Sequence, residues 1–305
     1  MKILITGANG FIGAHLCKEL SNRNIVFRAT ARNANENSYA DFVSCDLETT
    51  ESLSQLMNGC DIVVHLAGRA HVSSDDSQEK NRVANEFVTQ RLANAAAQTG
   101  LARFVYLSSI KVNGEPSVPG LQIRQSDTPN PLDNYGRSKL AAEQALQEIC
   151  RVNNMDYVII RPTLVYGRGV KANFSALISA VKRGFPFPIA TVKNARSMIG
   201  INNLIDLIVA ASTSPKAANQ TFLASDGSDT STPELVRLIA KSLNRPARIF
   251  PFPISILKLL AAVIRKSSAI DKLTGSLSVD ISHTTTILNW HPPFSVDSEI
   301  AKAVK

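Results

Sequence analysis

Short apolar runs alternate with longer amphipathic segments through the first half of the chain. The runs are rich in β-branched and aromatic residues, which is typical of buried strands, whereas the longer segments show helical periodicity. We predict strands at 2–6, 25–30, 41–45, 61–66, 103–108 and 156–161. We predict helices near 11–21, 51–57, 80–98 and 135–151. Strands and helices that alternate in this way predict an α/β fold, with a doubly wound parallel sheet that is covered by helices on both faces.

The regular alternation of predicted strands and helices ends after Pro162, where glycines and prolines interrupt mixed elements. The stretch STPE at 231–234 still marks a helix start, because it offers a hydroxyl cap, a proline and an acid in the first turn. We therefore predict a first domain over 1–168, rejoined by a segment near 197–225. A smaller C-terminal α/β substrate lobe is predicted over 169–305.

Charge adds little to this picture. The chain has 33 Lys and Arg against 25 Asp and Glu, a formal net charge of +8, but the cations are spread along the sequence. The positive electrostatic field that results also suits a phosphate-bearing small molecule, and we do not expect nucleic acid as a partner.

The cysteines and the apolar stretches bear on the compartment. The four cysteines show no paired spacing, which fits a reducing compartment, so we expect a cytoplasmic protein without a signal peptide. The most apolar stretch, 254–264, is too short to span a membrane. We expect it to form a core or amphipathic helix, with loose attachment to a membrane surface as the alternative.

A glycine-rich turn, GANGFIG, follows the first predicted strand and opens the first predicted helix. Its glycines, Gly7, Gly10 and Gly13, allow a tight turn and let a pyrophosphate approach the backbone at a helix N-terminus, whose dipole favours anions. Glycines also serve ordinary turns, but the place of this turn between a strand and a helix favours dinucleotide binding.

The stretch YGRSK at 135–139 opens another predicted helix. Tyr135 and Lys139 are four residues apart and share a helix face, so we expect the ammonium to lower the pKa of the phenol from about 10. Ser108 and Ser109 end a predicted strand upstream, at the edge where a parallel sheet presents active-site residues. No histidine has a second ligand at metal spacing, and we expect no metal site.

Taken in order, GANGFIG, Asp46, HLAG at 65–68, LSSIKVNG, YGRSK and RPTLVYG resemble the extended short-chain dehydrogenase/reductases, the NAD-dependent epimerase/dehydratase family. The resemblance covers essentially the whole chain and looks like the enzymes that act on nucleotide sugars. The stretches LSSIKVNGE, GVKANF and NQTFLASDG look like a bacterial subgroup of 4-ketoreductases that make UDP-N-acetylquinovosamine for surface polysaccharide. Its members are also labelled UDP-glucose 4-epimerases. The resemblance implies a Rossmann domain that binds NAD(P).

The resemblance implies a role for each matching residue. Ser109 would orient the reacting oxygen of the sugar, Tyr135 would transfer its proton, and Lys139 would assist and bind the nicotinamide ribose. The implied cofactor residues are Gly7, Asn9, Gly10, Phe11, Ile12, Gly13, Arg32, Asp46, Leu47, Leu66, Ala67, Gly68, Asn85, Ser108, Tyr135, Lys139, Pro162 and Val165. The residues assigned to the substrate are Lys111, Asn173 and Arg196.

Three of these residues have a purely structural alternative. Asp46 could simply cap a turn, Asn85 could be a satisfied polar residue on a buried helix, and Arg196 could be a surface cation. A guanidinium is nevertheless well suited to a diphosphate.

Two positions depart from the pattern of the family. Relatives that prefer NAD usually carry an acid after the second strand to bind the ribose 2′-hydroxyl, and this chain has Arg32 there. We therefore predict NADP(H) as the preferred cofactor, with NAD(H) as the alternative. Lys111 opens the stretch KVN, where the epimerases usually carry Thr and Tyr. This second departure weakens the case for epimerase activity.

These observations predict an oxidoreductase that acts at C4 of a UDP-sugar and most simply reduces a UDP-4-keto-6-deoxy-N-acetylhexosamine. A UDP-hexose or UDP-N-acetylhexosamine 4-epimerase would use the same residues and is the alternative. A catalytically silent cofactor-sensing or scaffold protein is the alternative of another class, although such proteins usually lack the Tyr or the Lys. The resemblance also implies a homodimer through the helices at 80–98 and 135–151.

Overall fold

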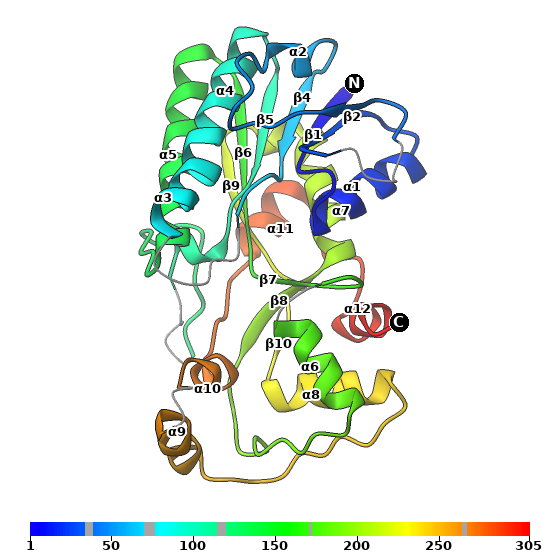
Figure 1. Cartoon of the computed structure of the whole chain (residues 1–305), viewed down its shortest axis with the longest axis vertical. Coiled ribbons are helices and arrows are strands. Elements are labelled where there is room, and N and C mark those ends of the chain that lie inside the picture. Colours follow the sequence, from blue (N-terminus) through cyan, green and yellow to red (C-terminus); the bar gives the residue numbers. More distant parts are fainter. Residues whose placement is uncertain (34–38, 70–76, 115–119, 171–172, 264–266) are drawn as a thin grey trace.

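The computed structural model describes residues 1–33, 39–69, 77–114, 120–170, 173–263 and 267–305. Its larger half is built on seven strands, which are β1 (Lys2–Thr6), β2 (Val26–Ala31), β3 (Phe42–Ser44), β4 (Ile62–His65), β5 (Arg103–Leu107), β6 (Asp156–Pro162) and β9 (Gln220–Ala224). They form one parallel sheet in the order β3-β2-β1-β4-β5-β6-β9 (Figure 1). The predicted doubly wound parallel sheet is confirmed.

Helices cover both faces of this sheet. They include α1 (Phe11–Asn22), α2 (Ser54–Met57), α3 (Ser77–Asn81), α4 (Val88–Gln98), α5 (Asn134–Asn153), α7 (Ile201–Thr213) and α11 (Ser282–Leu288). Successive β1 residues point to opposite faces, so that Ile3 and Ile5 join the core beneath α1 and α7, whereas Leu4 joins the core beneath α4 and α5. Both faces are apolar because both are buried.

The predicted helix at 80–98 has a break in its regularity. The chain forms α3, then a π-helical segment, η1 (Arg82–Phe87), and then α4. Periodicity could not show this widened turn, because the hydrophobic pattern continues through it. Such π-helical turns are frequent at functional sites.

The smaller half has strands and helices of its own. It contains β7 (Leu164–Tyr166), β8 (Arg196–Gly200), β10 (Asp229–Thr230), α6 (Asn173–Lys182), α8 (Thr232–Ser242), α9 (Ile254–Val263), α10 (Ser267–Thr274) and α12 (Val296–Ala303). Its strands form a separate sheet in the order β10-β8-β7. The predicted helix start at STPE is confirmed, since the Ser231 hydroxyl accepts a hydrogen bond from the Glu234 N–H at 3.3 Å.

The chain passes repeatedly between the two halves. It leaves the large sheet after β6, forms β7 and α6 in the smaller half, and continues from β8 directly into α7, which packs on α1. It then adds β9 to the edge of the large sheet, and α12 finally packs on α8 and β8. No helix in the described ranges is long and apolar enough to cross a membrane.

Candidate active site

The glycine turn between β1 and α1 packs backbone closely against backbone. A Cβ on Gly13 would lie 2.1 Å from the Gly7 carbonyl oxygen, and a Cβ on Gly7, whose φ is +70°, would lie 2.7 Å from the Ala67 nitrogen. Gly10 caps α1 without a side chain, so the backbone N–H groups of the first turn are available to an anion. The shape and the donors fit the pyrophosphate of a dinucleotide. The side chains of Phe11 and Ile12 instead pack into the core.

The end of β2 lies beside this turn. The Asn9 amide donates to the Asn33 carbonyl at 2.6 Å, and the Asn9 side-chain oxygen is buried without a partner in the described part of the chain. Arg32 is exposed at the same place, and its carbonyl accepts from the Ser44 hydroxyl at 2.8 Å. The structure therefore brings Arg32 and the glycine turn together, as a cofactor site requires.

Asp46 and Leu47 follow β3 in a tight turn. One Asp46 carboxylate oxygen accepts from the Glu48 N–H at 2.9 Å, so Asp46 does cap a turn, while Leu47 is buried. The guanidinium of Arg91, on α4, donates to the Leu47 and Glu48 carbonyls at 2.9 and 2.7 Å. Sequence reasoning missed Arg91, because nothing local connects it to a turn more than 40 residues away.

Ser109, Tyr135 and Lys139 meet at the carboxyl end of β5. The Ser109 hydroxyl lies near enough to the Tyr135 phenol to lower its pKa, and the Lys139 ammonium lies 6.0 Å from the centre of the Tyr135 ring. Burial raises the pKa of Tyr135 to about 12, although the nearby Ser109 hydroxyl opposes this shift. The expected lowering by Lys139 is therefore wrong for this structure. Although the two residues share a helix face, burial outweighs any effect of the ammonium on the phenol.

Lys139 is instead held by the strand beneath it. Its ammonium donates to the Leu107 carbonyl at 2.9 Å and lies 4.6 Å above the Tyr106 ring. Complete burial lowers its pKa from 10.5 to about 8, and the Glu143 carboxylate partly opposes that shift. Lys139 is thus mainly cationic at neutral pH but loses its proton far more easily than an exposed lysine.

Asn85 joins this cluster from the π-helical segment. Its amide donates to the Ser138 hydroxyl at 3.0 Å, and its carbonyl oxygen accepts from the Arg69 N–H at 2.9 Å. A Cβ on Gly68 would lie 2.9 Å from that oxygen and 3.3 Å from the Lys139 ammonium. Asn85 is therefore a satisfied buried polar residue that also borders Lys139 and Gly68.

The start of α5 is fixed by a residue that sequence reasoning missed. The Asp133 carboxylate accepts from the Gly136 N–H at 2.7 Å and pairs with the Lys111 ammonium at 2.6 Å. An Asp three residues before a helical N–H is a standard N-cap, so the sequence did carry this signal. Lys111, which we had assigned to the substrate, is thus bound to the residue that positions Tyr135.

A buried ion pair links α5 to β6. The Arg161 guanidinium binds the Glu143 carboxylate through two hydrogen bonds of 3.0 and 2.5 Å and also donates to the Asn113 side chain at 3.0 Å. Both charged side chains are at least nine-tenths buried. The pair joins α5, the end of β6 and the loop after β5, which carry Tyr135, Pro162 and Ser109.

Some of the remaining predicted residues lie at the large sheet, and the others lie in the smaller half. The Ser108 hydroxyl is buried without a partner in the described ranges, at the same strand end as Ser109, and Leu66 and Val165 pack against the core of the large sheet. Arg196 lies in β8 of the smaller sheet, where its guanidinium donates to the Gly275 carbonyl at 3.4 Å. Asn173 begins α6, and its side chain lies outside the described part of the structure.

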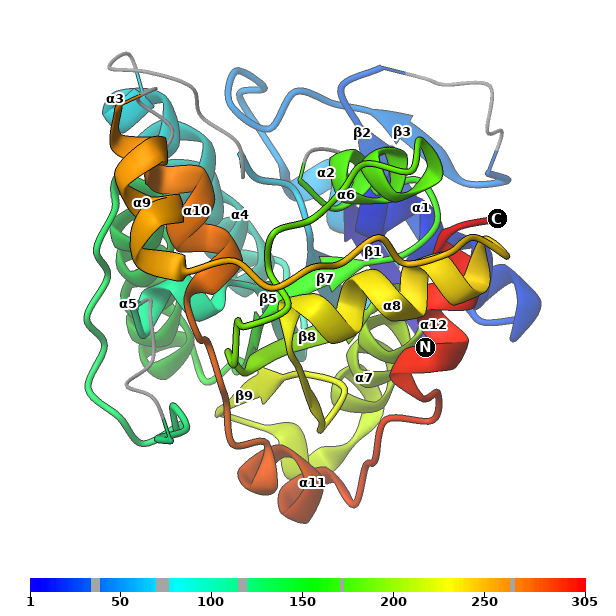
Figure 2. The same cartoon turned by 90° about the horizontal axis from the view of Figure 1, so that it is seen from below.

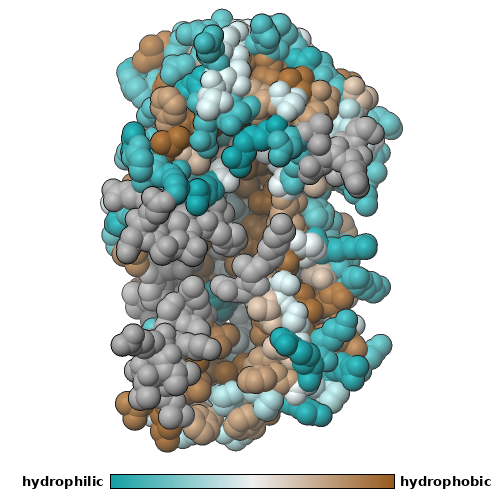
Figure 3. Space-filling view, viewed as in Figure 1, coloured by the Kyte–Doolittle hydropathy of each residue, from teal (hydrophilic) through white to brown (hydrophobic). Residues whose placement is uncertain are grey.

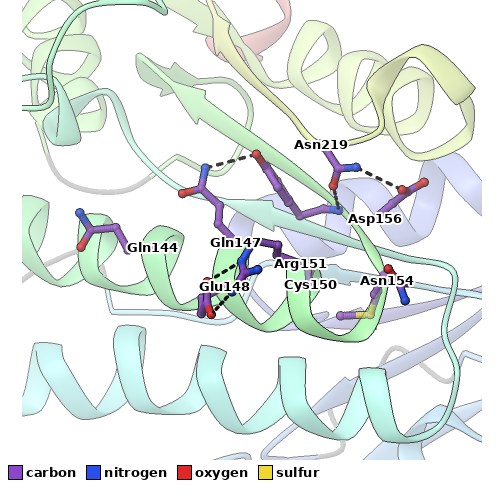
Figure 4. Close-up of a pocket in the computed structure, with 10 residues that line it drawn as sticks. Gln144, Gln147, Glu148, Cys150, Arg151, Asn154, Asp156 and Asn219 are labelled. Carbon is purple, nitrogen blue, oxygen red and sulfur yellow. Dashed lines mark hydrogen bonds and ion pairs between the residues drawn. The ribbon is translucent and has the colours of Figure 1, made fainter.

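A cavity lies at the opposite end of α5. It has a volume of about 760 Å³ and is bordered by polar side chains such as Gln147, Arg151 and Asp156 (Figure 4). Arg151 is 16 residues beyond Tyr135 on the same helix, which corresponds to about 24 Å. The cavity therefore lies at the amino ends of the strands and has no part in the chemistry at their carboxyl ends.

The burial of Lys139 leads to a stability prediction. The folded protein loses this proton near pH 8, whereas the unfolded chain keeps it up to about pH 10.5, so the folded state gains about 1.4 kcal/mol per pH unit between these values. We expect the cofactor-free Lys139→Met variant to exceed the wild type in unfolding free energy by on the order of 1–3 kcal/mol at about pH 7. The advantage should shrink towards pH 10. Urea unfolding at both pH values measures it, and a constant difference would exclude the charge as its cause.

Comparisons with known proteins identify the family of the chain. Residues 3–223 match the model of the NAD dependent epimerase/dehydratase family. A UDP-glucose 4-epimerase from Vibrio cholerae is 43% identical over 95% of this chain and 90% of its own length. One from Mycolicibacterium smegmatis is 28% identical over 100% and 98%. The crystal structure of UDP-glucuronic acid 4-epimerase from Bacillus cereus with UDP-glucuronic acid and NAD superposes with a TM-score of 0.81, at 25% identity over 100% and 98% of the two chains.

The family match covers the glycine turn, Ser109, Tyr135 and Lys139, which are the residues that the structure gathers at the carboxyl end of the large sheet. The chain therefore belongs to the NAD dependent epimerase/dehydratase family.

Proposed function

We propose that this protein is an NAD-dependent enzyme that epimerises a UDP-sugar at C4. The convergence of Ser109, Tyr135 and Lys139 beside the glycine turn carries the proposal. Ser109 can orient the reacting oxygen of the sugar, Tyr135 can exchange the proton of that oxygen, and Lys139 is a buried cation. The similarity to a UDP-glucose 4-epimerase over nearly the whole length of both chains supports the choice of reaction.

The side chains suggest how the site works. When bound, the nicotinamide supplies the acceptor and the donor of the hydride at C4. Ser109 would hold the oxygen on C4, and Tyr135 would exchange the proton of that oxygen. With a pKa of about 12, the phenol is protonated at neutral pH, which is the form that donates. Lys139 would place a positive charge beside the cofactor and the reacting carbon.

The test is to purify the protein without added cofactor and to incubate it with UDP-glucose or UDP-N-acetylglucosamine. The proposal predicts the galacto epimer in the product mixture, with close to one equivalent of nicotinamide cofactor co-purifying per chain. Epimerisation needs no net oxidation or reduction, so no external NADH or NADPH should be consumed. A folded, cofactor-loaded protein that leaves both sugars unchanged would contradict the proposal for these substrates.

A second candidate is net reduction of a UDP-4-keto-6-deoxy-N-acetylhexosamine, in the synthesis of a surface polysaccharide precursor. Arg32 favours it, because an exposed guanidinium beside the glycine turn, with no acid at the described end of β2, suits the 2′-phosphate of NADPH. A reductase must also release oxidised cofactor in every turnover. Loss of NADPH absorbance with the 4-keto sugar, without epimerisation of UDP-glucose, would decide for this candidate.

This second candidate includes a cofactor prediction. If Arg32 binds the 2′-phosphate, NADPH should bind more tightly than NADH by roughly tenfold to a hundredfold, since a charge-assisted hydrogen bond contributes about 1.5–3 kcal/mol. Arg32→Ala should remove the preference by weakening NADPH binding alone. Dissociation constants for both cofactors, measured by fluorescence titration of both proteins, check it. Equal constants in the wild type would exclude the NADP preference.

Two further expectations belong with this proposal. A homodimer through α4 and α5 stays a prediction; in the single chain, Ala93, Ala96 and Ala142 on these helices are already buried. The four cysteines are free, which is what a reducing compartment such as the cytoplasm would maintain.

A further inference from the structure

Two chain segments lie side by side at the end of the smaller half that is farthest from the large sheet. Residues 182–193 connect α6 to β8, and residues 244–259 connect α8 to α9 and include its first turns. The Phe187 N–H donates to the Arg248 carbonyl at 2.8 Å, and the Phe250 N–H donates to the Phe187 carbonyl at 3.0 Å. Figure 2, seen from below, shows the second segment crossing this end of the molecule towards α9. We refer to these two segments as the distal surface.

The charge of the distal surface has one sign. The two segments contain six cationic residues and no Asp or Glu, and all six are exposed: Lys182, Arg183, Lys193, Arg245, Arg248 and Lys258. Lys258 pairs with Asp271 of α10 at 3.5 Å. With no acid among them, these six cations contribute strongly to the formal net charge of +8.

Large apolar side chains are exposed among these cations. Phe185 and Phe250 project from the two connecting segments, with exposed fractions of 57% and 41%. On α9, Ile256 and Leu259 are 46% and 67% exposed and lie three residues apart, on one helix face, whereas Ile254 packs into the core of the smaller half. Figure 3 shows apolar residues gathered along this end of the molecule.

We propose that the distal surface docks on an anionic phospholipid bilayer. Exposed aromatic and aliphatic side chains surrounded by Lys and Arg are the features of a surface that inserts shallowly among lipid headgroups. Each cation near an anionic membrane adds to the attraction for the lipid headgroups. A second copy of the chain fits less well, because a symmetric dimer through this surface would bring twelve like charges together. The proposal does not rest on the reaction proposed above.

The experiment is co-sedimentation of the full chain with vesicles of phosphatidylcholine alone or of equal parts phosphatidylcholine and phosphatidylglycerol. Binding is expected to the mixed vesicles and to weaken as salt rises, because added ions screen the cations. The Ile256→Ser, Leu259→Ser double variant should bind the mixed vesicles roughly tenfold or more weakly, since two large apolar groups no longer enter the headgroup region. The matched control is Val152→Ser, which replaces a side chain that is 62% exposed on α5.

Each outcome decides the proposal. Equal binding to both vesicles, no binding to either, or equal losses in the double variant and the control would overturn it. The wild type could instead bind no vesicles and self-associate, with the double variant alone losing that self-association. This result would make a second copy of the chain the occupant of the distal surface. If the double variant does not keep the thermal stability of the wild type, the Arg245→Gln variant replaces it and should weaken binding to the mixed vesicles severalfold.

Discussion

Replacing Tyr135 by phenylalanine is expected to lower kcat by about 10²–10⁴-fold, while the affinity for the cofactor changes little. The substitution keeps the ring in place and removes the hydroxyl whose pKa Ser109 lowers. Proton exchange with the oxygen on C4 then has no side-chain partner in the described site, whereas the glycine turn and Lys139 are untouched. The effect should therefore appear in kcat rather than in KM.

Steady-state kinetics and a cofactor titration measure the two quantities separately. Tyr157→Phe is the matched control, because its phenol bonds to Gln147 at 3.4 Å at the other end of the sheet. It should retain the activity of the wild type. A Tyr135→Phe enzyme with most of its kcat would remove this tyrosine from the mechanism, whichever sugar is the substrate.

Glu143→Ala is expected to lower the unfolding free energy by about 3–5 kcal/mol. The substitution leaves the Arg161 guanidinium buried, with the Asn113 side chain as its remaining hydrogen-bond partner among the described residues and no counter-charge from Glu143. An unpaired buried charge is much more costly than a lost pair. Activity should fall as well, because the pair fixes α5 and the strand ends that position Ser109 and Tyr135.

The control on the same helix is Glu148→Ala, which removes an exposed ion pair with Arg151 and should leave stability nearly unchanged. Replacing both partners, Glu143→Leu with Arg161→Met, should be less destabilising than Glu143→Ala alone, since no charge is then left unpaired. Denaturant unfolding of the four proteins checks these expectations. A double variant that is less stable than the single variant would show that packing, rather than charge, sets the effect.

The parts of the fold that sequence reasoning predicted well are those with local signals. All six predicted strands are present within one or two residues of their expected ends, because each is a short run rich in β-branched or other apolar residues. The seventh strand, β9, was expected only as part of a returning segment near 197–225. The glycine turn could also be predicted from the sequence, because Gly7 and Gly13 occupy positions where a side chain would collide with the backbone.

The site was predicted less well where its geometry depends on residues far apart in the sequence. Spacing placed Tyr135 and Lys139 on one helix face, but the Leu107 carbonyl and the Tyr106 ring decide where the ammonium lies. The link between Arg161 and Glu143 joins a strand to a helix and follows from no local pattern. Asp133 is different, because its capping position was visible in the sequence and was overlooked.

The repeated crossing of the chain between its halves bears on how the protein unfolds. A chain cut after Gly167 would lack α7, which covers one face of the large sheet, and β9, which pairs with β6. The edge of β6 and much of the apolar core would then be open to water and to strand pairing with other chains. Limited proteolysis should therefore release no folded cofactor-binding fragment, and both halves should melt in a single cooperative transition.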